Sequence, residues 1–302
     1  MVQLAPVPSL TLPCPAKINL FLAVTGRRAD GFHDLVSVVS PLAWGDELSV
    51  QTTADGAFTL ACDKPDVPLD DTNLVLRAAK AFRGATGWTG GAHFELTKRI
   101  PAGAGLGGGS SDAVAALRAL NQLAGQPLTA AGLSEVAVQV GSDCPLFLAD
   151  APVTMRGRGE RIEPLPAAVA ARLRGQRVLL CKPPFGINTA WAYRQLAAAA
   201  PVSYQAPNIA EAHVAAWMAD PERPLEDLAV NSFEAVVFAK QVTLPVLAQD
   251  LRETCGLHLH LSGSGSACFV LLDPDHSPVG ACERISRAWG PQAWMKETQL
   301  SH

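Results

Sequence analysis

The sequence predicts an α+β fold, and three observations support this. Strand-like and helix-like stretches alternate along the 302 residues, without an internal repeat or a low-complexity block. Hydrophobic residues make up 48% of the chain, which is enough for more than one core. A chain of this length also exceeds what a single core usually supports. We therefore expect two domains that combine sheets with helices.

The elements of the first half follow from the period of their apolar residues. Strands are predicted where apolar and polar residues alternate or form short apolar runs, at residues 18–24, 35–42, 47–53, 58–62, 93–96 and 153–156. Helices are predicted where apolar residues recur at helical spacing, at residues 73–83, 111–123 and 133–140.

A turn-rich stretch at residues 157–160, followed by Pro164 and Pro166, predicts the crossing between two domains. We place these domains at 1–160 and 161–302. The same periods predict strands in the second domain at 177–182, 257–261, 267–272 and 293–300. They predict helices there at 189–196, 208–218, 232–239, 244–254 and 279–289.

Composition excludes several classes of protein. The net charge of −4 provides no basic surface for nucleic acid. The seven cysteines form no CxxC pair, so neither a zinc cage nor a disulfide framework is indicated. The chain begins without the pattern of a signal peptide, and no apolar stretch approaches the length that spans a membrane. We therefore expect a cytoplasmic protein without a membrane partner.

The most informative segment is PAGAGLGGGSS at residues 101–111, which leads directly into a predicted helix. Its glycines carry no Cβ that would hold an anion away from consecutive backbone N–H groups. Ser110 and Ser111 add hydroxyls at the expected helix cap, where the free N–H groups and the helix dipole favour negative charge. We interpret this segment as a phosphate-binding loop. A flexible linker is the alternative, but the loop lies between two segments that are predicted to be packed.

Three better-known nucleotide motifs do not fit. The glycines satisfy GxGxxG, but residues 98–101 separate them from the preceding strand, and no acidic residue follows a second strand at Rossmann spacing. No lysine precedes Ser110, as a Walker loop requires. The His-Arg-Asp and Asp-Phe-Gly signatures of protein kinases are missing from the sequence.

Two charged residues are candidates for catalysis, although each has a structural alternative. Asp143 follows a helix and precedes an apolar strand, a position from which a buried carboxylate could act as a base. Alone, it is more typical of an Asp that stabilises a turn. Lys17 interrupts an apolar strand, with Asn19 on the same face. Without further context, a solvent-facing Lys is the preferred interpretation of position 17.

The turn at residues 31–34 places the Phe32 ring beside the His33 imidazole. Such a pair could stack on a planar base and form hydrogen bonds with its edge. A packed aromatic residue and a solvated histidine are the structural alternative.

These motifs together resemble the GHMP kinase superfamily, which phosphorylates small alcohols and acids with ATP. The glycine loop matches the superfamily's ATP loop, residues 15–20 match its N-terminal motif, and residues 261–269 match its C-terminal glycine motif. The segments 27–34 and 141–147 are similar to a branch whose alcohol substrate carries a diphosphocytidyl group. The resemblance implies a two-lobed fold with a ribosomal-S5-like N-terminal domain and a ferredoxin-like C-terminal domain.

The resemblance also implies roles for individual residues. Asp143 becomes the catalytic base and Lys17 the residue that assists it. The residues implied in ATP binding are Asn73, Pro101, Ala102, Gly103, Ala104, Gly105, Leu106, Gly107, Gly108, Gly109, Ser110 and Ser111. Those implied in binding the cytidyl substrate are Asn19, Phe32, His33, Thr189, Tyr193, Gly263 and Ser264. Tyr193, rather than Trp191 or Phe185, is aligned as the second aromatic partner of the cytosine.

Mg²⁺ is expected to accompany ATP, although the sequence does not identify its ligands. The only partners we expect are the two small-molecule substrates, with no obligate protein partner. Two alternatives stay open. A GHMP kinase acting on mevalonate, homoserine or a sugar would keep the glycine motifs, but would have no reason to keep Phe32 and His33. A catalytically silent nucleotide-binding regulator would be expected to have lost Lys17 or Asp143.

Overall fold

The structure is a computed structural model, and it describes residues 9–301. Its contacts divide the chain into two compact units. Unit 1 contains, among the described residues, 9–16, Gly45–Pro101 and Gly107–Asp150. Unit 2 contains Lys17–Trp44, Ala102–Leu106 and the described residues from Ala151 onward. This division groups contacts within the chain, and the two family domains at 1–160 and 161–302 stay a prediction.

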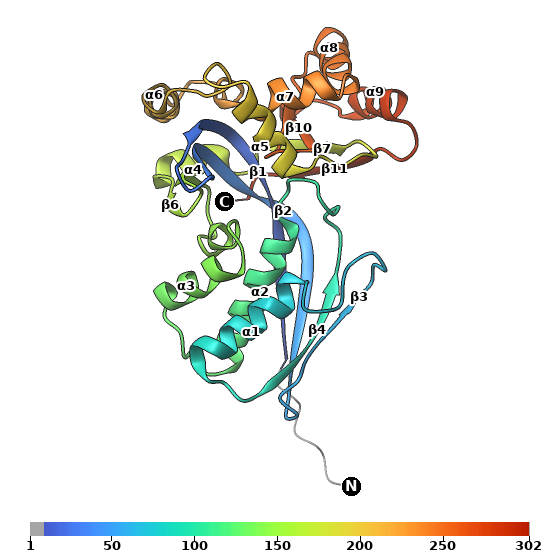
Figure 1. The fold of residues 1–302 in the computed structure, drawn as a ribbon. Helices are drawn as coiled ribbons and strands as arrows, with labels where there is room; N and C mark the ends of the chain where they lie inside the picture. The colour runs from blue at the N-terminus through green and yellow to red at the C-terminus, as the bar shows by residue number, and fades with distance from the viewer. Residues whose placement is uncertain (1–8, 302) are drawn as a thin grey trace. The chain divides into compact units, whose positions relative to one another are not determined.

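Unit 1 combines a sheet with a group of helices. Strand β3 (Phe58–Cys62) pairs parallel with β4 (Gly91–Thr97), and β4 pairs antiparallel with the second half of β2 (His33–Thr53). Helices α1 (Leu74–Thr86), α2 (Gly108–Leu123) and α3 (Ala130–Val140) pack on one another and lie on one side of these strands (Figure 1). The short 3₁₀ helix η1 (Cys144–Leu148) packs against α2 and α3.

Strand β2 corrects an expectation from the sequence, because it is one strand of 21 residues and not two. The break predicted at residues 43–46, between strands 35–42 and 47–53, includes Gly45. In the structure, a Cβ at Gly45 would lie 2.0 Å from the carbonyl oxygen of Cys14, in strand β1 (Ser9–Arg27). Glycine is therefore required there by the close approach of two backbones, and the strand continues through it.

Unit 2 contains a four-stranded antiparallel sheet formed by β7 (Arg177–Lys182), β9 (His260–Leu261), β10 (Cys268–Leu272) and β11 (Trp294–Gln299). The strands lie in the order β11-β7-β10-β9. Counted along the chain this order is 4-1-3-2, with helices between the first and second strands and between the third and fourth. This arrangement is the ferredoxin-like topology expected for the C-terminal domain.

The helices of unit 2 agree with the predicted ones at most positions. They are α4 (Ala167–Leu173), α5 (Thr189–Ala198), α6 (Pro207–Ala219), α7 (Phe233–Lys240), α8 (Thr243–Cys255) and α9 (Val279–Trp289), with the 3₁₀ helix η2 (Leu225–Leu228). Helices α8 and α9 pack on each other and lie, with α7, on one side of the four-stranded sheet (Figure 1). Helix α4 is absent from the sequence prediction, because we assigned the proline-containing segment before it to an irregular crossing.

The remaining strands of unit 2 are short. Strand β5 (Val153–Gly157) pairs antiparallel with the first half of β2 and with β6 (Arg161–Pro164), while β8 (Val230–Asn231) pairs parallel with β1. The turn-rich segment at residues 157–160 therefore closes a β-hairpin within unit 2.

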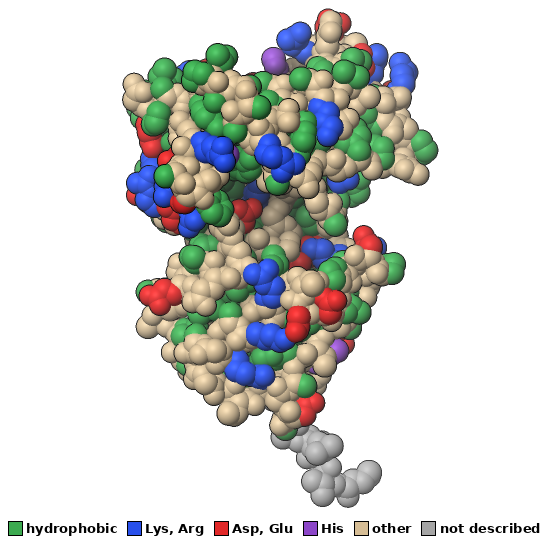
Figure 2. All heavy atoms as spheres, viewed as in Figure 1, with side chains coloured by type: hydrophobic (Ala, Val, Ile, Leu, Met, Phe, Trp, Pro, Cys, Tyr) green, Lys and Arg blue, Asp and Glu red, His purple; other side chains and the backbone are tan. Residues whose placement is uncertain are grey.

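One face of the molecule carries charges of both signs. On the face shown in Figure 2, Lys and Arg side chains are separated by acidic and uncharged ones. Within residues 9–301, no helix is long and apolar enough to cross a membrane.

Candidate active site

The first half of the glycine loop, residues 102–106, packs against the C-terminal glycine motif within unit 2. Gly105 has a φ of +80°, and a Cβ there would lie 2.4 Å from the carbonyl oxygen of Ser262. The backbone N–H of Ala267 donates to the carbonyl oxygen of Ala104 at 2.9 Å. Position 105 is therefore restricted to glycine both by its left-handed backbone and by the close approach of a neighbouring segment.

The second half of the loop forms the beginning of helix α2 in unit 1. Gly107 is the N-cap with a φ of +75°, and the first helical bond runs from the Ser111 N–H to the Gly107 carbonyl oxygen at 3.0 Å. The backbone N–H groups of Gly108, Gly109 and Ser110 therefore have no carbonyl acceptor within the helix. Free N–H groups at a glycine-rich helix N-terminus form a site suited to phosphate.

The structure corrects the predicted cap of this helix. Ser110 and Ser111 lie inside the first turn of α2, whereas the cap itself is Gly107 and has no side-chain hydrogen bond. The Ser111 hydroxyl is buried and has no hydrogen-bond partner within the described part of the chain. The helix begins earlier than predicted because Gly107 adopts a conformation that L-residues avoid.

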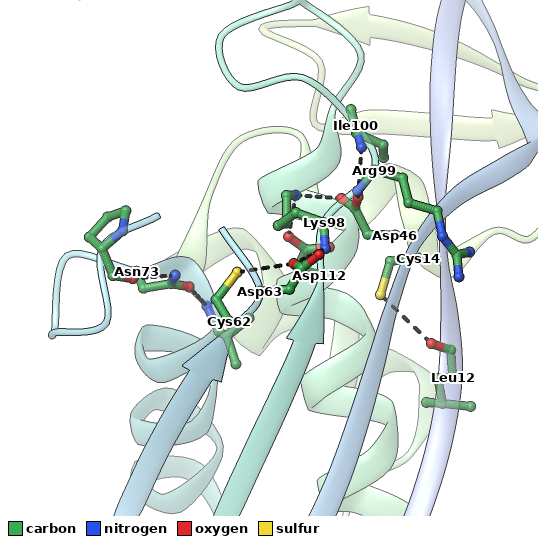
Figure 3. Close-up of polar contacts among 12 residues, drawn as sticks. Leu12, Cys14, Asp46, Cys62, Asp63, Asn73, Lys98, Arg99, Ile100 and Asp112 are labelled. Atoms are coloured by element: carbon green, nitrogen blue, oxygen red, sulfur yellow. Dashed lines mark hydrogen bonds and ion pairs between the residues drawn. The ribbon is translucent and has the colours of Figure 1, made fainter. Parts of the chain in front are cut away.

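A buried ion network fixes the beginning of α2 to the sheet of unit 1, as Figure 3 shows. Lys98 Nζ, at the end of β4, donates to Asp112 Oδ2 at 2.8 Å and also to Asp46 Oδ2. Asp46 Oδ1 accepts the backbone N–H groups of Arg99 and Ile100 at 2.5 and 2.8 Å. One ammonium is thus shared by two carboxylates from two different elements.

Within this network, the charged form of Asp112 is disfavoured. Burial raises its pKa to about 7; the Lys98 ammonium opposes that shift and the Asp46 carboxylate adds to it. Its Oδ1 is buried without a hydrogen-bond partner among residues 9–301. This network was not predicted from the sequence, although Lys98 and Asp112 lie on either side of the glycine loop and could have indicated it.

Asp143 differs in two respects from the sequence expectation. The segment after it is the 3₁₀ helix η1 and not a strand, and Asp143 is the N-cap of this helix without a side-chain capping bond. Its side chain is exposed rather than buried. Proline at position 145 is compatible with the first turn of a helix but not with the interior of a strand.

The neighbour of Asp143 connects it to the glycine loop within unit 1. The Cys144 thiol is buried in η1, which packs against α2, the helix that carries Ser110 in its first turn. Burial raises the pKa of Cys144 to about 11, and the nearby Ser110 hydroxyl acts in the opposite direction. The thiol is therefore protonated at neutral pH, and η1 is held beside the start of α2 by packing.

Lys17 is buried, so the solvent-facing interpretation of this residue is wrong. Its Nζ donates to Asn19 Oδ1 at 2.7 Å and to the carbonyl oxygen of Gly105 at 2.7 Å. Asn19 Nδ2 in turn donates to the Ser37 hydroxyl at 3.0 Å. The predicted placement of Lys17 and Asn19 on one strand face is confirmed, and their network includes the glycine loop.

The C-terminal glycine motif lies against the same network in unit 2. A Cβ on Gly263, which has a φ of +59°, would lie 3.5 Å from Lys17 Nζ and 3.5 Å from Asn19 Oδ1. The hydroxyls of Ser264 and Thr189 are 2.8 Å apart. Asn231, which we did not identify from the sequence, donates to the carbonyl oxygens of Leu261 and Gly263 at 2.7 and 2.9 Å and so holds the motif in place.

His33 and Phe32, the two neighbouring rings of the predicted base site, make different contacts in unit 2. The His33 ring stacks on Tyr193 with centroids 4.8 Å apart. The Phe32 ring is 54% exposed, and the Arg158 guanidinium lies 4.7 Å from its centroid. Of the other candidate aromatics, Trp191 is covered by Lys240 Nζ at 3.9 Å. His33 is thus adjacent to Tyr193, whereas Phe32 is exposed and its ring contacts the Arg158 guanidinium.

Asn73 has a structural task at the start of helix α1. Its side chain accepts from the Val75 N–H at 2.9 Å and donates to the Pro68 carbonyl oxygen at 2.7 Å. The next residue, Leu74, approaches the glycine loop, since its Cδ1 would lie 3.5 Å from a Cβ on Gly109. The predicted ATP-binding residue therefore lies in a rigid cap beside the loop.

The ionisable residues do not form a metal cage of their own. Within the described residues no group of three or more His, Cys, Asp or Glu side chains could hold a metal ion.

Comparison with known proteins agrees with this geometry. Residues 73–158 match the model of the GHMP kinases N terminal domain. The chain is 36% identical over 297 residues to the 4-diphosphocytidyl-2-C-methyl-D-erythritol kinase of Synechococcus sp. (strain CC9902), covering 94% of this chain and 95% of that protein. It is 38% identical over 264 residues to the protein of the same name from Protochlamydia amoebophila (strain UWE25), covering 87% and 84%.

Solved structures give the same result. A crystal structure of 4-(cytidine 5'-diphospho)-2C-methyl-D-erythritol kinase superposes with a TM-score of 0.76 at 35% identity, covering 96% of this chain and 99% of that chain. A mevalonate kinase structure superposes with a TM-score of 0.72 at 12% identity, covering 96% and 99%. The second likeness shows the fold alone, and together these matches confirm the two-lobed GHMP kinase fold.

Proposed function

Because this chain belongs to the family of 4-diphosphocytidyl-2-C-methyl-D-erythritol kinases, we propose that it transfers the γ-phosphoryl group of ATP to the 2-hydroxyl of that diphosphocytidyl alcohol. The chain is an ATP-dependent small-molecule kinase of the GHMP fold. Its reaction would belong to the non-mevalonate route to isoprenoid precursors. The observation that carries the proposal is the glycine loop. In this loop Gly107 has a left-handed φ and is the N-cap of α2.

The loop would bind the triphosphate of ATP with backbone groups. The N–H groups of Gly108, Gly109 and Ser110 are the donors at the start of α2. The network of Lys98, Asp46 and Asp112 would keep the start of α2 rigid when the triphosphate of ATP binds. Asn73 would bind ATP from its position at the start of α1, next to Leu74 and Gly109.

Catalysis would rest on one base and one cation. Asp143 is exposed and its side chain makes no capping bond, so its carboxylate is available to accept the proton of the substrate hydroxyl. Lys17 would assist by stabilising negative charge, because its buried ammonium is held in a fixed position by Asn19 and Gly105.

The cytidyl group would be recognised by unit 2. Phe32 offers an exposed ring face for stacking, and the half-buried His33 offers a ring nitrogen for the edge of the base. Tyr193, which stacks on His33, would complete the aromatic surroundings of the base. Thr189, Gly263 and Ser264 would bind the remainder of the substrate, next to Lys17 and Asn19.

Magnesium would accompany ATP. When bound, the ion bridges phosphate oxygens and neutralises the charge that develops during transfer. We further propose a cytoplasmic location, no nucleic-acid or membrane partner, and no obligate protein partner. A mevalonate, homoserine or sugar kinase of the same fold is the second candidate, and a silent nucleotide-binding regulator is the third.

The test is an assay of ATP consumption with a panel of alcohols. We expect turnover with 4-diphosphocytidyl-2-C-methyl-D-erythritol, and little with mevalonate, homoserine or galactose. Phosphorylation of another member of the panel in place of the cytidyl alcohol would contradict the proposed substrate. ATP binding without turnover of any alcohol would favour the regulator. Full activity after complete chelation of divalent cations would contradict the role of magnesium.

A further inference from the structure

Both tyrosines of the chain contact the same histidine. The sequence contains two tyrosines, Tyr193 and Tyr204. The Tyr193 ring stacks on His33 with an interplanar angle of 28°. The Tyr204 ring meets the same imidazole edge-on, with centroids 5.9 Å apart, and its hydroxyl oxygen lies 3.1 Å from His33 Nε2. The ring of His33 is therefore restrained by one stacking contact and one hydrogen bond.

The segment that carries Tyr204 is itself anchored. The backbone N–H of Tyr204 donates to the Pro201 carbonyl oxygen at 3.1 Å, and that of Gln205 donates to the Val24 carbonyl oxygen of β1 at 3.1 Å. The Ser203 hydroxyl donates to the Leu196 carbonyl oxygen of α5 at 2.6 Å. Tyr204 is thus fixed on both sides by elements of unit 2, and its hydroxyl is delivered to His33 from a rigid position.

The protonation state of His33 follows from its surroundings. Burial and, secondarily, the nearby Arg27 lower its pKa, so the imidazole is neutral at pH 7. A neutral imidazole has one nitrogen that donates and one that accepts. The phenol of Tyr204 is a good donor and a poor acceptor, because its oxygen lone pair is delocalised into the ring. We therefore assign the Tyr204 hydroxyl as donor and His33 Nε2 as acceptor, which leaves the proton on Nδ1.

The Nδ1 proton has a consequence for base recognition. Tyr204 occupies His33 Nε2, so Nδ1 is the ring nitrogen that would meet a ligand. Cytosine presents an acceptor at N3, whereas uracil presents an N–H group at the same position. An Nδ1–H donor suits the first base and opposes the second, and a site built for one hydrogen-bond pattern rejects the other strongly.

We propose that Tyr204 is a positioning residue that holds His33 in the Nδ1–H tautomer, and that the cytidyl over uridyl preference of the enzyme depends on this hydrogen bond. The inference rests on the proposed function, since it assumes that His33 meets the pyrimidine edge. It adds Tyr204, a residue that motif comparison did not identify, to the recognition of the base.

The test variant is Tyr204→Phe, which keeps the ring contact and removes only the hydroxyl. In the wild type, ¹⁵N NMR of the histidine side chains should show His33 protonated at Nδ1, with the signal identified by its loss in His33→Gln. In Tyr204→Phe the imidazole should shift toward the intrinsically preferred Nε2–H tautomer. The ratio of kcat/KM for the cytidyl over the uridyl substrate should fall by about 2-fold to 10-fold, the effect expected for one neutral hydrogen bond.

Ser203→Ala is the matched control, because it also removes a hydroxyl from the same segment but leaves His33 Nε2 bonded. It should keep both the tautomer and the cytidyl preference, and the KM for ATP should be unchanged in both variants. The proposal is overturned if wild-type His33 is protonated at Nε2. It is also overturned if Tyr204→Phe leaves either the tautomer or the substrate ratio as in the wild type. A wild type without activity on the cytidyl alcohol would instead contradict the proposed function, whatever the tautomer.

Discussion

Lys17 Nζ lies 2.7 Å from the carbonyl oxygen of Gly105, although 88 positions separate the two residues in the sequence. The ammonium of a strand residue is thereby joined to the glycine loop, and Asn19 holds the same ammonium at 2.7 Å. A charge fixed in this way needs no reorganisation when negative charge develops, which is the condition for strong electrostatic catalysis.

Replacing Lys17 with methionine tests this role, since methionine keeps an apolar stem and removes the charge. We expect kcat to fall by about two to three powers of ten, the usual effect of losing one such donor. The dissociation constant of ATP, measured by calorimetry, should change far less. Lys80→Met, at an exposed lysine of α1, is the control and should behave as the wild type. Near-normal turnover in Lys17→Met would leave Lys17 with a purely structural role.

Asp143→Asn tests the proposed base. The carboxylate is exposed and forms no capping bond, so its replacement should leave the melting temperature unchanged. Turnover should fall by about two to four powers of ten, as expected for a positioned acid or base, while ATP still binds. Asp220→Asn, at another exposed Asp, provides the comparison. An active Asp143→Asn enzyme would assign the proton transfer to another group.

Gly107→Val tests the phosphate loop. The left-handed φ of +75° makes any L-residue strained there, at a cost of about 1–3 kcal/mol, and a branched Cβ would obstruct the N–H groups at the start of α2. We expect the dissociation constant of ATP to rise far more than that of the cytidyl substrate. Gly84→Val, in a helix with open space around it, is the matched control. Unaltered ATP affinity in a folded Gly107→Val protein would place the nucleotide elsewhere.

The buried Asp112 predicts a pH dependence of stability. Its folded pKa of about 7 lies above the ordinary value near 4 that it has in the unfolded chain. Between these values the folded protein binds a proton that the unfolded chain has released, so stability from this group is present below about pH 4 and is lost as pH rises through 7. The groups that face Asp112 are Lys98, Asp46 and the Cys14 thiol.

Denaturant unfolding of the wild type and Asp112→Asn at several pH values measures this effect. From about pH 5 to about pH 8, the free energy of unfolding of the wild type should fall relative to the variant by roughly 1–3 kcal/mol. The titrations of all other groups cancel in this difference. The free energy of unfolding of Asp220→Asn should change with pH in parallel with that of the wild type. Parallel curves for Asp112→Asn would mean that Asp112 stays ionised beside Lys98 throughout.

Sequence patterns predicted the types of most elements, because periodicity reports which residues face a core. They failed at residues 43–46, where they predicted a break between two strands. Gly45 instead permits a close approach to the backbone of Cys14, which only the partner strand reveals. The pairing of Lys17 with Asn19 was predictable from the strand period, but its bond to Gly105 depends on tertiary contact. The exposure of Asp143 could not be deduced either, since it depends on η1 replacing the expected strand.

Phe32→Ala tests whether the turn before β2 recognises a base, and it separates this enzyme from other GHMP kinases. Phe32 is 54% exposed and the Arg158 guanidinium lies over its ring, so truncation should affect stability little. Loss of a base–aromatic stack is worth roughly 1–3 kcal/mol, so the KM for the cytidyl substrate should rise by about one to two powers of ten. The KM for ATP should be almost unchanged.

Two companion variants complete this test. Phe32→Tyr keeps the stacking face and should retain a KM close to that of the wild type. His33→Ala should act differently, by relaxing the choice between cytidyl and uridyl substrates, because an edge-directed hydrogen bond discriminates between bases where a stacking face does not. If Phe32→Ala weakened ATP and the cytidyl substrate equally, the turn would be a scaffold. The assignment of this chain's substrate among the small-alcohol kinases would then lose the support of its turn motif.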